Sequence, residues 1–205
     1  TATASDTFRL MDPISHRMVG VRADMTPQIA RIAASRMSHM PRPLRLSYAG
    51  QVLRVKGSEM RPERQIGQAG AELIGAESPA ADVEAVAVAA EALQAVGVPH
   101  LSVDLTLPTL VPAIVEAFGL AGPREAALRA ALDHKDAAAV ASLAGNAGAL
   151  LAELIAAAGV APATRAALDR LDLPARAREE RDRLGAVLDG LAAALPNLKV
   201  TVDPV

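Results

Sequence analysis

The chain has 205 residues, and 51% of them are hydrophobic, yet it contains only one tyrosine, two phenylalanines and no tryptophan. Its core must therefore be aliphatic. The absence of cysteine excludes a disulfide framework and a cysteine-based metal site. A net charge of −2 with so few aromatic rings argues against nucleic-acid binding.

Charge is distributed unevenly along the chain. Residues 1–75 carry 11 Lys and Arg against 6 Asp and Glu, a net charge of +5, whereas residues 76–205 carry 10 against 17, a net charge of −7. An arginine-rich first part can attract an anion such as a nucleotide phosphate. No signal peptide opens the chain, and charged residues interrupt its apolar stretches before they could span a bilayer. We therefore expect a cytoplasmic protein that does not enter a membrane.

The first 43 residues predict two short strands followed by a helix. Residues 7–11 and 17–23 have β character and are joined at Asp12 by a turn signal. Thr26 is predicted to be the N-cap of the helix, because Pro27 is favoured at the first helical position. This helix is expected to end near residue 39.

Two extended runs, residues 44–55 and 64–74, flank a polar loop and predict a β-hairpin. Side chains alternate between the two faces of a strand. One face of the second strand carries Arg64, Ile66, Gln68, Gly70 and Glu72. The other face carries Ala69, Ala71 and Leu73, which suit a core.

The first of these faces presents a cation, an amide and a carboxylate in a row. Because Arg donates, Gln does both and ionised Glu accepts, the row could hold a small zwitterion. A solvated sheet face is the alternative, and it is the more common reason for charged residues on a strand. Gly67 and Gly70 favour a binding site, since glycine in a strand often marks the close approach of a ligand or a backbone.

The remainder of the chain is predicted to be mostly helical. Ser78 begins a helix that Gly97 ends, and residues 98–105 alternate as a strand. Glycine and proline then separate six helical segments. These segments are 109–118, 123–133, 135–143, 147–158, 163–171 and 175–194. A last strand, residues 198–203, is expected to return to the sheet.

This order of elements predicts an α+β fold with an antiparallel sheet flanked by helices. The expected division has three parts. Residues 1–107 form a core that contains the hairpin, residues 108–196 form an all-helical insertion, and residues 197–205 return to the core as a strand.

Two blocks of sequence resemble a known family. LRLSYAGQVLR and RQIGQAGAELIG, at residues 44–54 and 64–75, resemble motif 2 of class II aminoacyl-tRNA synthetases in the form found in histidyl-tRNA synthetase. VGVRADMTPQIAR, at residues 19–31, resembles the segment of that family in which an Arg-Pro-Glu/Asp-x-Thr run precedes a helix. The resemblance implies a class II synthetase-like fold with a histidine pocket.

The resemblance also implies roles for individual residues. Four residues match positions that hold histidine: Asp24, Thr26, Gln68 and Glu72. Arg54 matches the arginine that contacts the α-phosphate of ATP, and Arg64 is a second candidate for binding an anion. No residue is assigned a catalytic or metal-binding role.

The ATP side of the motif departs from the synthetase pattern. Lys56 stands in place of a glutamate that engages the adenosine, which reverses the charge and the hydrogen-bonding role. Pro62 stands in place of a loop arginine and has no N–H donor. Losing groups that orient ATP typically costs orders of magnitude in rate. We therefore expect a non-catalytic relative.

A family of non-catalytic relatives, the regulatory subunits of ATP phosphoribosyltransferase, is similar to this sequence in both blocks and in its VTVDPV end. This resemblance implies a protein without a cofactor that joins the short-form catalytic subunit, as a homodimer within a hetero-oligomer, for the first step of histidine biosynthesis. Histidine would be its feedback effector. Two alternatives are left open: a fragment of an active histidine–tRNA ligase, and an unrelated α+β binding module.

The family pattern leads us to expect further chain on both sides of this sequence. Motif 1 would precede Thr1. An Arg-Gly-aromatic segment and motif 3 would follow Val205. A piece without these parts would have exposed sheet edges, which favour association.

Overall fold

A computed structural model of the chain describes residues 4–60, 62–120, 122 and 125–205. The chain divides into two compact units, Thr1–Glu77 and Ser78–Val205, each of which is described by itself. This division differs from the expected one, because residues 78–107 group with the helical segments rather than with the hairpin.

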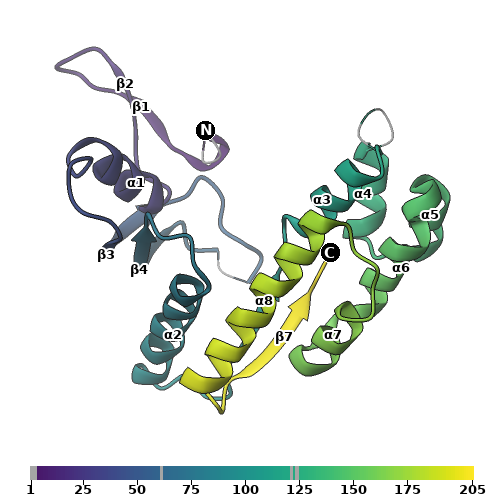
Figure 1. Cartoon of the computed structure of the whole chain (residues 1–205). Coiled ribbons are helices and arrows are strands. Elements are labelled where there is room, and N and C mark those ends of the chain that lie inside the picture. The colour runs from purple at the N-terminus through teal and green to yellow at the C-terminus, as the bar shows by residue number, and fades with distance from the viewer. Residues whose placement is uncertain (1–3, 61, 121, 123–124) are drawn as a thin grey trace. The chain divides into compact units, whose positions relative to one another are not determined.

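The first unit contains two antiparallel hairpins and one helix (Figure 1). After a short 3-10 helix, η1 (Ala4–Asp6), β1 (Arg9–Met11) pairs with β2 (Met18–Gly20). Asp12 closes the turn between them by accepting hydrogen bonds from the backbone of Ile14 and from Ser15. The expected pair of strands and its turn are confirmed, although both strands are shorter than predicted.

Helix α1 (Thr26–Ser35) begins and ends differently from the prediction. Its N-cap is Met25, and Thr26 makes no side-chain cap because its hydroxyl contacts other side chains. The carboxylate of Asp24 accepts the Thr26 N–H at 3.0 Å instead. The helix ends at Ser35, before the expected position 39, and Ala33 is its buried residue.

The second hairpin, β3 (Leu44–Leu53) and β4 (Gln65–Ile74), matches the sequence prediction closely. The strands pair over their whole length, so that Tyr48 lies opposite Gly70 and Leu46 opposite Glu72. The prediction of a core face was wrong for two residues, since Ala69 and Ala71 are exposed. The covered face is the one that carries the polar row.

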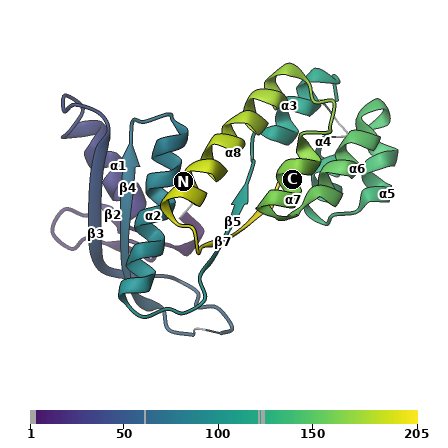
Figure 2. The same cartoon turned by 60° about the horizontal axis from the view of Figure 1, so that its bottom comes forward.

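The second unit consists of helices around a small mixed sheet (Figures 1 and 2). Its helices are α2 (Pro79–Ala95), α3 (Leu110–Ala117), α4 (Glu125–Asp133), α5 (Ala137–Leu143), α6 (Gly148–Ala157), α7 (Ala161–Leu168) and α8 (Ala175–Ala194). A 3-10 turn, η2 (Gly145–Ala147), precedes α6. These bounds confirm the predicted segments within a few residues. Positions 123 and 124, expected at the start of one segment, lie outside the described residues.

The two ends of α2 confirm the predicted signals. The Ser78 side chain accepts the Ala81 N–H at 3.3 Å, and Gly97 has a φ of +81°. Helix α2 packs beside α8. A Cβ at Gly190 of α8 would clash with the Val83 side chain of α2. Arg183 of α8 also pairs with Asp82 of α2 at 3.1 Å.

The sheet of the second unit has the strand order β5–β7–β6. Strand β7 (Lys199–Asp203) runs parallel to β5 (Ser102–Thr106) and antiparallel to β6 (Gly159–Val160). The position of the last strand was predicted correctly; the sequence named no pairing partner for it, and in the structure it joins β5 and β6. A cluster of buried aliphatic side chains surrounds this sheet, and Leu110, Ile114, Leu151 and Leu154 are fully buried in it.

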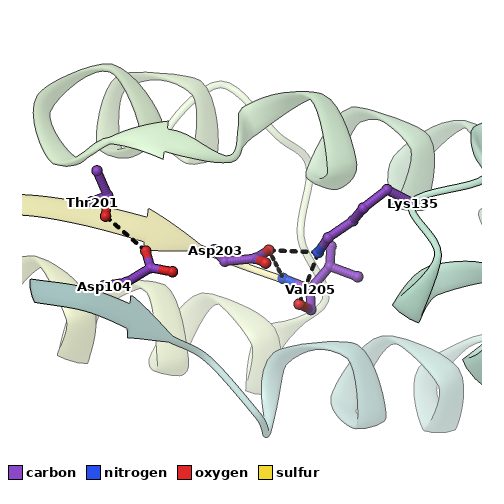
Figure 3. A network of polar contacts seen from close by, with 5 residues as sticks. All are labelled: Asp104, Lys135, Thr201, Asp203 and Val205. Carbon is purple, nitrogen blue, oxygen red and sulfur yellow. Dashed lines mark hydrogen bonds and ion pairs between the residues drawn. The ribbon is translucent and has the colours of Figure 1, made fainter. Parts of the chain in front are cut away.

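Polar contacts fasten the end of β7 (Figure 3). Lys135, which follows α4, pairs with Asp203 at 2.7 Å and donates to the Val205 carbonyl at 3.1 Å. The Thr201 hydroxyl donates to Asp104 on the neighbouring strand at 2.8 Å. The sequence end VTVDPV is therefore held in place by residues 68 to 97 positions earlier in the chain.

Across the described residues, no helix combines the length and the apolar character needed to cross a membrane.

Candidate functional site

The candidate site lies in the first unit, where residues 22–26 cross the covered face of the β3–β4 hairpin. Backbone contacts fix this crossing: Leu53 N–H donates to the Arg22 carbonyl at 2.9 Å, and the Arg22 guanidinium donates back to the Gln51 carbonyl at 2.7 Å. Gly50 leaves room for this approach, since a Cβ there would lie 3.0 Å from Arg22 and 3.1 Å from Met25.

Asp24 and Gln68 form one half of the site. The Gln68 amide donates to Asp24 Oδ1 at 2.9 Å, and its oxygen accepts the Met25 N–H at 2.9 Å. The hydrogen bond from Gln68 is the main reason why the pKa of Asp24 lies below its ordinary value of 3.8. The Thr26 N–H and the positive charge of Arg54 lower this pKa further, against the opposing effect of burial. Asp24 is therefore a carboxylate at neutral pH.

Thr26, Tyr48 and Glu72 form the other half. The Thr26 hydroxyl donates to Glu72 Oε1 at 3.0 Å and lies 3.0 Å from the Tyr48 hydroxyl. The Tyr48 hydroxyl also lies 3.3 Å from the same oxygen of Glu72. The four residues that the resemblance singles out therefore converge on one face, joined through Thr26.

A hollow of about 330 Å³ adjoins Thr26 and Glu72. Its other walls come from the facing side of α1, from the end of β4 and from the segment before β3. They are Ala30, Ala33, Ala34, Arg42 and Ile74. The small alanine side chains leave this space open, and the polar groups lie at its Thr26 end and at Arg42.

Arg54 and Arg64, the two arginines proposed for anion binding, have different surroundings. Arg54 donates to the Ala23 carbonyl at 3.5 Å and acts on the charge of Asp24, so it belongs to the edge of the site. Arg64 instead has its guanidinium 5.9 Å from the centre of the Phe8 ring, a cation–π contact. Lys56 and Pro62 lie exposed in the loop between the strands.

The two glycines of β4 have roles other than the expected approach of a ligand. A Cβ at Gly70 would lie 2.5 Å from the Tyr48 hydroxyl oxygen, so the space is taken by that ring. Gly67 lies on the opposite, uncovered face, where its nearest neighbour is the Gln51 amide at 3.8 Å. Tyr48 was not predicted as a site residue; the observed register places it opposite Gly70 on the polar face.

The two carboxylates of this arrangement can accept hydrogen bonds from N–H groups. A carboxylate with a lowered pKa can bind an ammonium group, and a second carboxylate 3.0 Å from the same threonine can accept another N–H. Among the residues that the structure describes, no group of three His, Cys, Asp or Glu side chains could hold a metal.

Comparison with known proteins places the chain in a sequence family. A model of the family described as histidyl-tRNA synthetase matches residues 1–205. Two curated proteins named ATP phosphoribosyltransferase regulatory subunit are similar to it: the protein of Paramagnetospirillum magneticum is 60% identical over 99% of this chain and 54% of its own, and that of Rhodospirillum centenum is 56% identical over 100% and 53%. This chain therefore spans about half the length of the curated relatives it matches.

A solved structure shows the same fold. It is described as an ATP phosphoribosyltransferase regulatory subunit/histidyl-tRNA synthetase from Bacillus halodurans C, and it superposes with a TM-score of 0.81 at 25% sequence identity. The alignment covers 98% of this chain and 53% of that one. The class II synthetase-like α+β fold expected from the sequence is thereby confirmed.

Proposed function

The chain belongs to the histidyl-tRNA synthetase family, and from this premise we propose that it is part of a non-catalytic regulatory subunit of ATP phosphoribosyltransferase. The observation that carries the proposal is the identity of 56–60% to proteins of that name over nearly the whole chain. In the proposed role it acts in the cytoplasm, joins the short-form catalytic subunit as a homodimer within a hetero-oligomer, and serves the first step of histidine biosynthesis.

The proposed ligand is histidine, the feedback effector, bound by Asp24, Thr26, Gln68 and Glu72. Its ammonium group lies beside Asp24, whose lowered pKa keeps the carboxylate charged, and within reach of the Gln68 oxygen. Its imidazole N–H donates to Glu72. The alanine-walled hollow next to Thr26 and Glu72 offers space for the ring.

The absence of synthetase activity is proposed from the loop between β3 and β4. Lys56 and Pro62 occupy positions where the family's active members orient ATP, and neither supplies the acceptor or the donor required there. The alternative, an active histidine–tRNA ligase, has in its favour the family model and part of the description of the Bacillus halodurans structure.

The deciding experiment mixes the whole protein with a short-form ATP phosphoribosyltransferase. The proposal expects one co-eluting complex, a higher turnover of the catalytic subunit, and inhibition of that turnover by histidine. The same protein should show no histidine-dependent exchange of pyrophosphate into ATP. Exchange at rates typical of synthetases, with separate elution and unchanged turnover, would establish the alternative.

The histidine site has its own test. A hydrogen bond to a charged group contributes about 1.5–3 kcal/mol, so Glu72→Ala should weaken histidine binding in the whole protein about 10- to 150-fold. Glu72→Gln keeps an acceptor and should weaken it less. Calorimetry measures the affinity and a thermal melt measures stability. A lower melting temperature with unchanged histidine affinity would make Glu72 a purely structural residue.

A further inference from the structure

Tyr48 lies in the Thr26–Glu72 half of the site without belonging to the residues that the family resemblance assigns. Its ring starts on β3, crosses the paired residue Gly70 of β4, and ends with its hydroxyl between Thr26 and Glu72. A Cβ at Gly70 would lie 2.5 Å from the hydroxyl oxygen and 2.6 Å from Cζ. The ring therefore reaches this place only because residue 70 is a glycine.

The three oxygen atoms of Thr26, Tyr48 and Glu72 form a triangle with sides of 3.0, 3.0 and 3.3 Å. The two hydroxyl groups carry one hydrogen each, and the triangle has three oxygen–oxygen contacts. At any moment only two of the three contacts can therefore be hydrogen bonds. Both hydroxyls can donate to Glu72 Oε1, or one of them donates to the other, which in turn donates to Glu72. In both arrangements Oε1 is occupied.

No hydrogen bond to the other oxygen of Glu72, Oε2, is found within the described part of the chain. A carboxylate can accept several hydrogen bonds, and its two oxygens are fixed to each other. Holding Oε1 by the linked hydroxyls of Thr26 and Tyr48 therefore sets the direction in which Oε2 faces. The side chain that contacts the ligand is Glu72, and the side chain that orients Glu72 is Tyr48.

We propose that Tyr48 is a positioning residue of the histidine site, which aims the Glu72 carboxylate at the imidazole N–H. This inference rests on the proposed function. Tyr48 itself touches no ligand. Its effect reaches the ligand through Glu72. Because the Glu72 carboxylate is already ordered before histidine binds, binding does not carry the entropic cost of ordering it.

The test is a double-mutant cycle for histidine affinity, measured by calorimetry on the whole protein. Tyr48→Phe keeps the ring over Gly70 and removes only the hydroxyl, so we expect about a 3- to 10-fold loss of affinity. In a Glu72→Ala background, Tyr48→Phe should cost nothing further, because the carboxylate that it orients is gone. The matched control is Ser47→Ala, which removes a hydroxyl from the next residue on the opposite, exposed face and should change nothing.

The possible outcomes are distinct. An equal loss from Tyr48→Phe in both backgrounds would mean that the tyrosine hydroxyl contributes independently of Glu72, for example through Thr26, which overturns the inference. Unchanged affinity in Tyr48→Phe, with a clear loss in Glu72→Ala, overturns the inference and leaves the histidine site standing. Unchanged affinity in Glu72→Ala overturns the histidine site and the role of Tyr48 together.

Discussion

Different interactions stabilise the interior of each of the two units of this chain. In Ser78–Val205, a continuous cluster of Leu, Ile, Val and Ala side chains surrounds the β5–β7–β6 sheet. In Thr1–Glu77, the buried hydrophobic residues are few and scattered, and hydrogen bonds connect residues 22–26 to the β3–β4 hairpin. Apolar burial dominates stability in proteins, contributing about 25 cal/mol per Å². The first unit therefore depends more on its polar contacts, and those contacts are also the candidate site.

This difference assigns separate tasks to the two units. The polar groups of the candidate site form hydrogen bonds with one another when no ligand is bound, and they can exchange these hydrogen bonds for hydrogen bonds to a ligand. An aliphatic core has no such hydrogen bonds. Ligand binding adds stability to the state that binds. Histidine should therefore stabilise the first unit selectively, and mutations should affect one unit at a time.

The largest expected effect comes from a cavity in the second unit. Leu154 on α6 is 0% exposed, and Leu154→Ala should destabilise this unit by about 2–5 kcal/mol because the space cannot fully collapse. Hydrogen exchange should show reduced protection of amides in α3–α8, with unchanged protection in β3 and β4. The control is Glu153→Ala at the exposed neighbouring position, with an effect within about 0.5 kcal/mol. Equal losses in both units would show that they unfold as one.

A smaller effect is expected where two helices approach closely. A Cβ at Gly148 of α6 would lie 2.8 Å from the carbonyl oxygen and 2.9 Å from the Cα of Ala141 in α5. Backbone atoms cannot rotate away, so Gly148→Ala should cost up to about 3 kcal/mol, more than the roughly 1 kcal/mol gained in helix propensity. Denaturant unfolding followed by a probe in the second unit measures the difference.

A second helical glycine in the same unit tests whether close packing explains the effect at Gly148. A Cβ at Gly185 of α8 would meet only the Arg165 side chain, at 3.6 Å or more. Gly185→Ala should therefore stabilise the unit by up to about 1 kcal/mol, since only the helix propensity changes. If both alanine variants shifted stability in the same direction, close packing against α5 would not be the reason for Gly148.

Much of this fold could be predicted because its signals are local. Glycine and proline separate the helices of the second unit, and the Ser78 cap and the positive φ of Gly97 are properties of a few neighbouring residues. The sequence did not show which strand β7 pairs with, because this pairing joins residues almost 100 positions apart. The alternation of side chains along β7 does not indicate which strand it pairs with.

The site could be predicted in part, for a similar reason. The period of β4 placed Gln68 and Glu72 on one face, but it did not show which face would be covered. Thr26 was predicted as a helix cap from its neighbour Pro27. In the structure Asp24 receives the Thr26 N–H, while Glu72, which is 46 residues away, takes the hydroxyl. A tertiary contact thus outweighed a correct local preference.

The smallest expected effect concerns acid, and it tests whether polar contacts hold the first unit. The pKa of Asp24 lies below its ordinary value of 3.8, chiefly because the Gln68 amide donates to it. A carboxyl whose pKa is lowered by folding adds stability that is complete above its unfolded value. That stability is lost as the pH falls below 3.8 through the lowered pKa. Gln68→Ala removes the main cause, so the pKa should rise towards 3.8 and the acid-dependent loss should shrink.

Asp12 provides an internal control for this titration, which carboxyl NMR signals of both residues can follow in one sample. Its pKa is also lowered, but the cause is the Ser15 hydroxyl in the turn between β1 and β2, which Gln68 does not contact. In Gln68→Ala the Asp12 signal should therefore titrate as before while the Asp24 signal moves. If both pKa values rose together, the variant would have loosened the whole first unit. If neither moved, the amide of Gln68 would not be what lowers the pKa of Asp24.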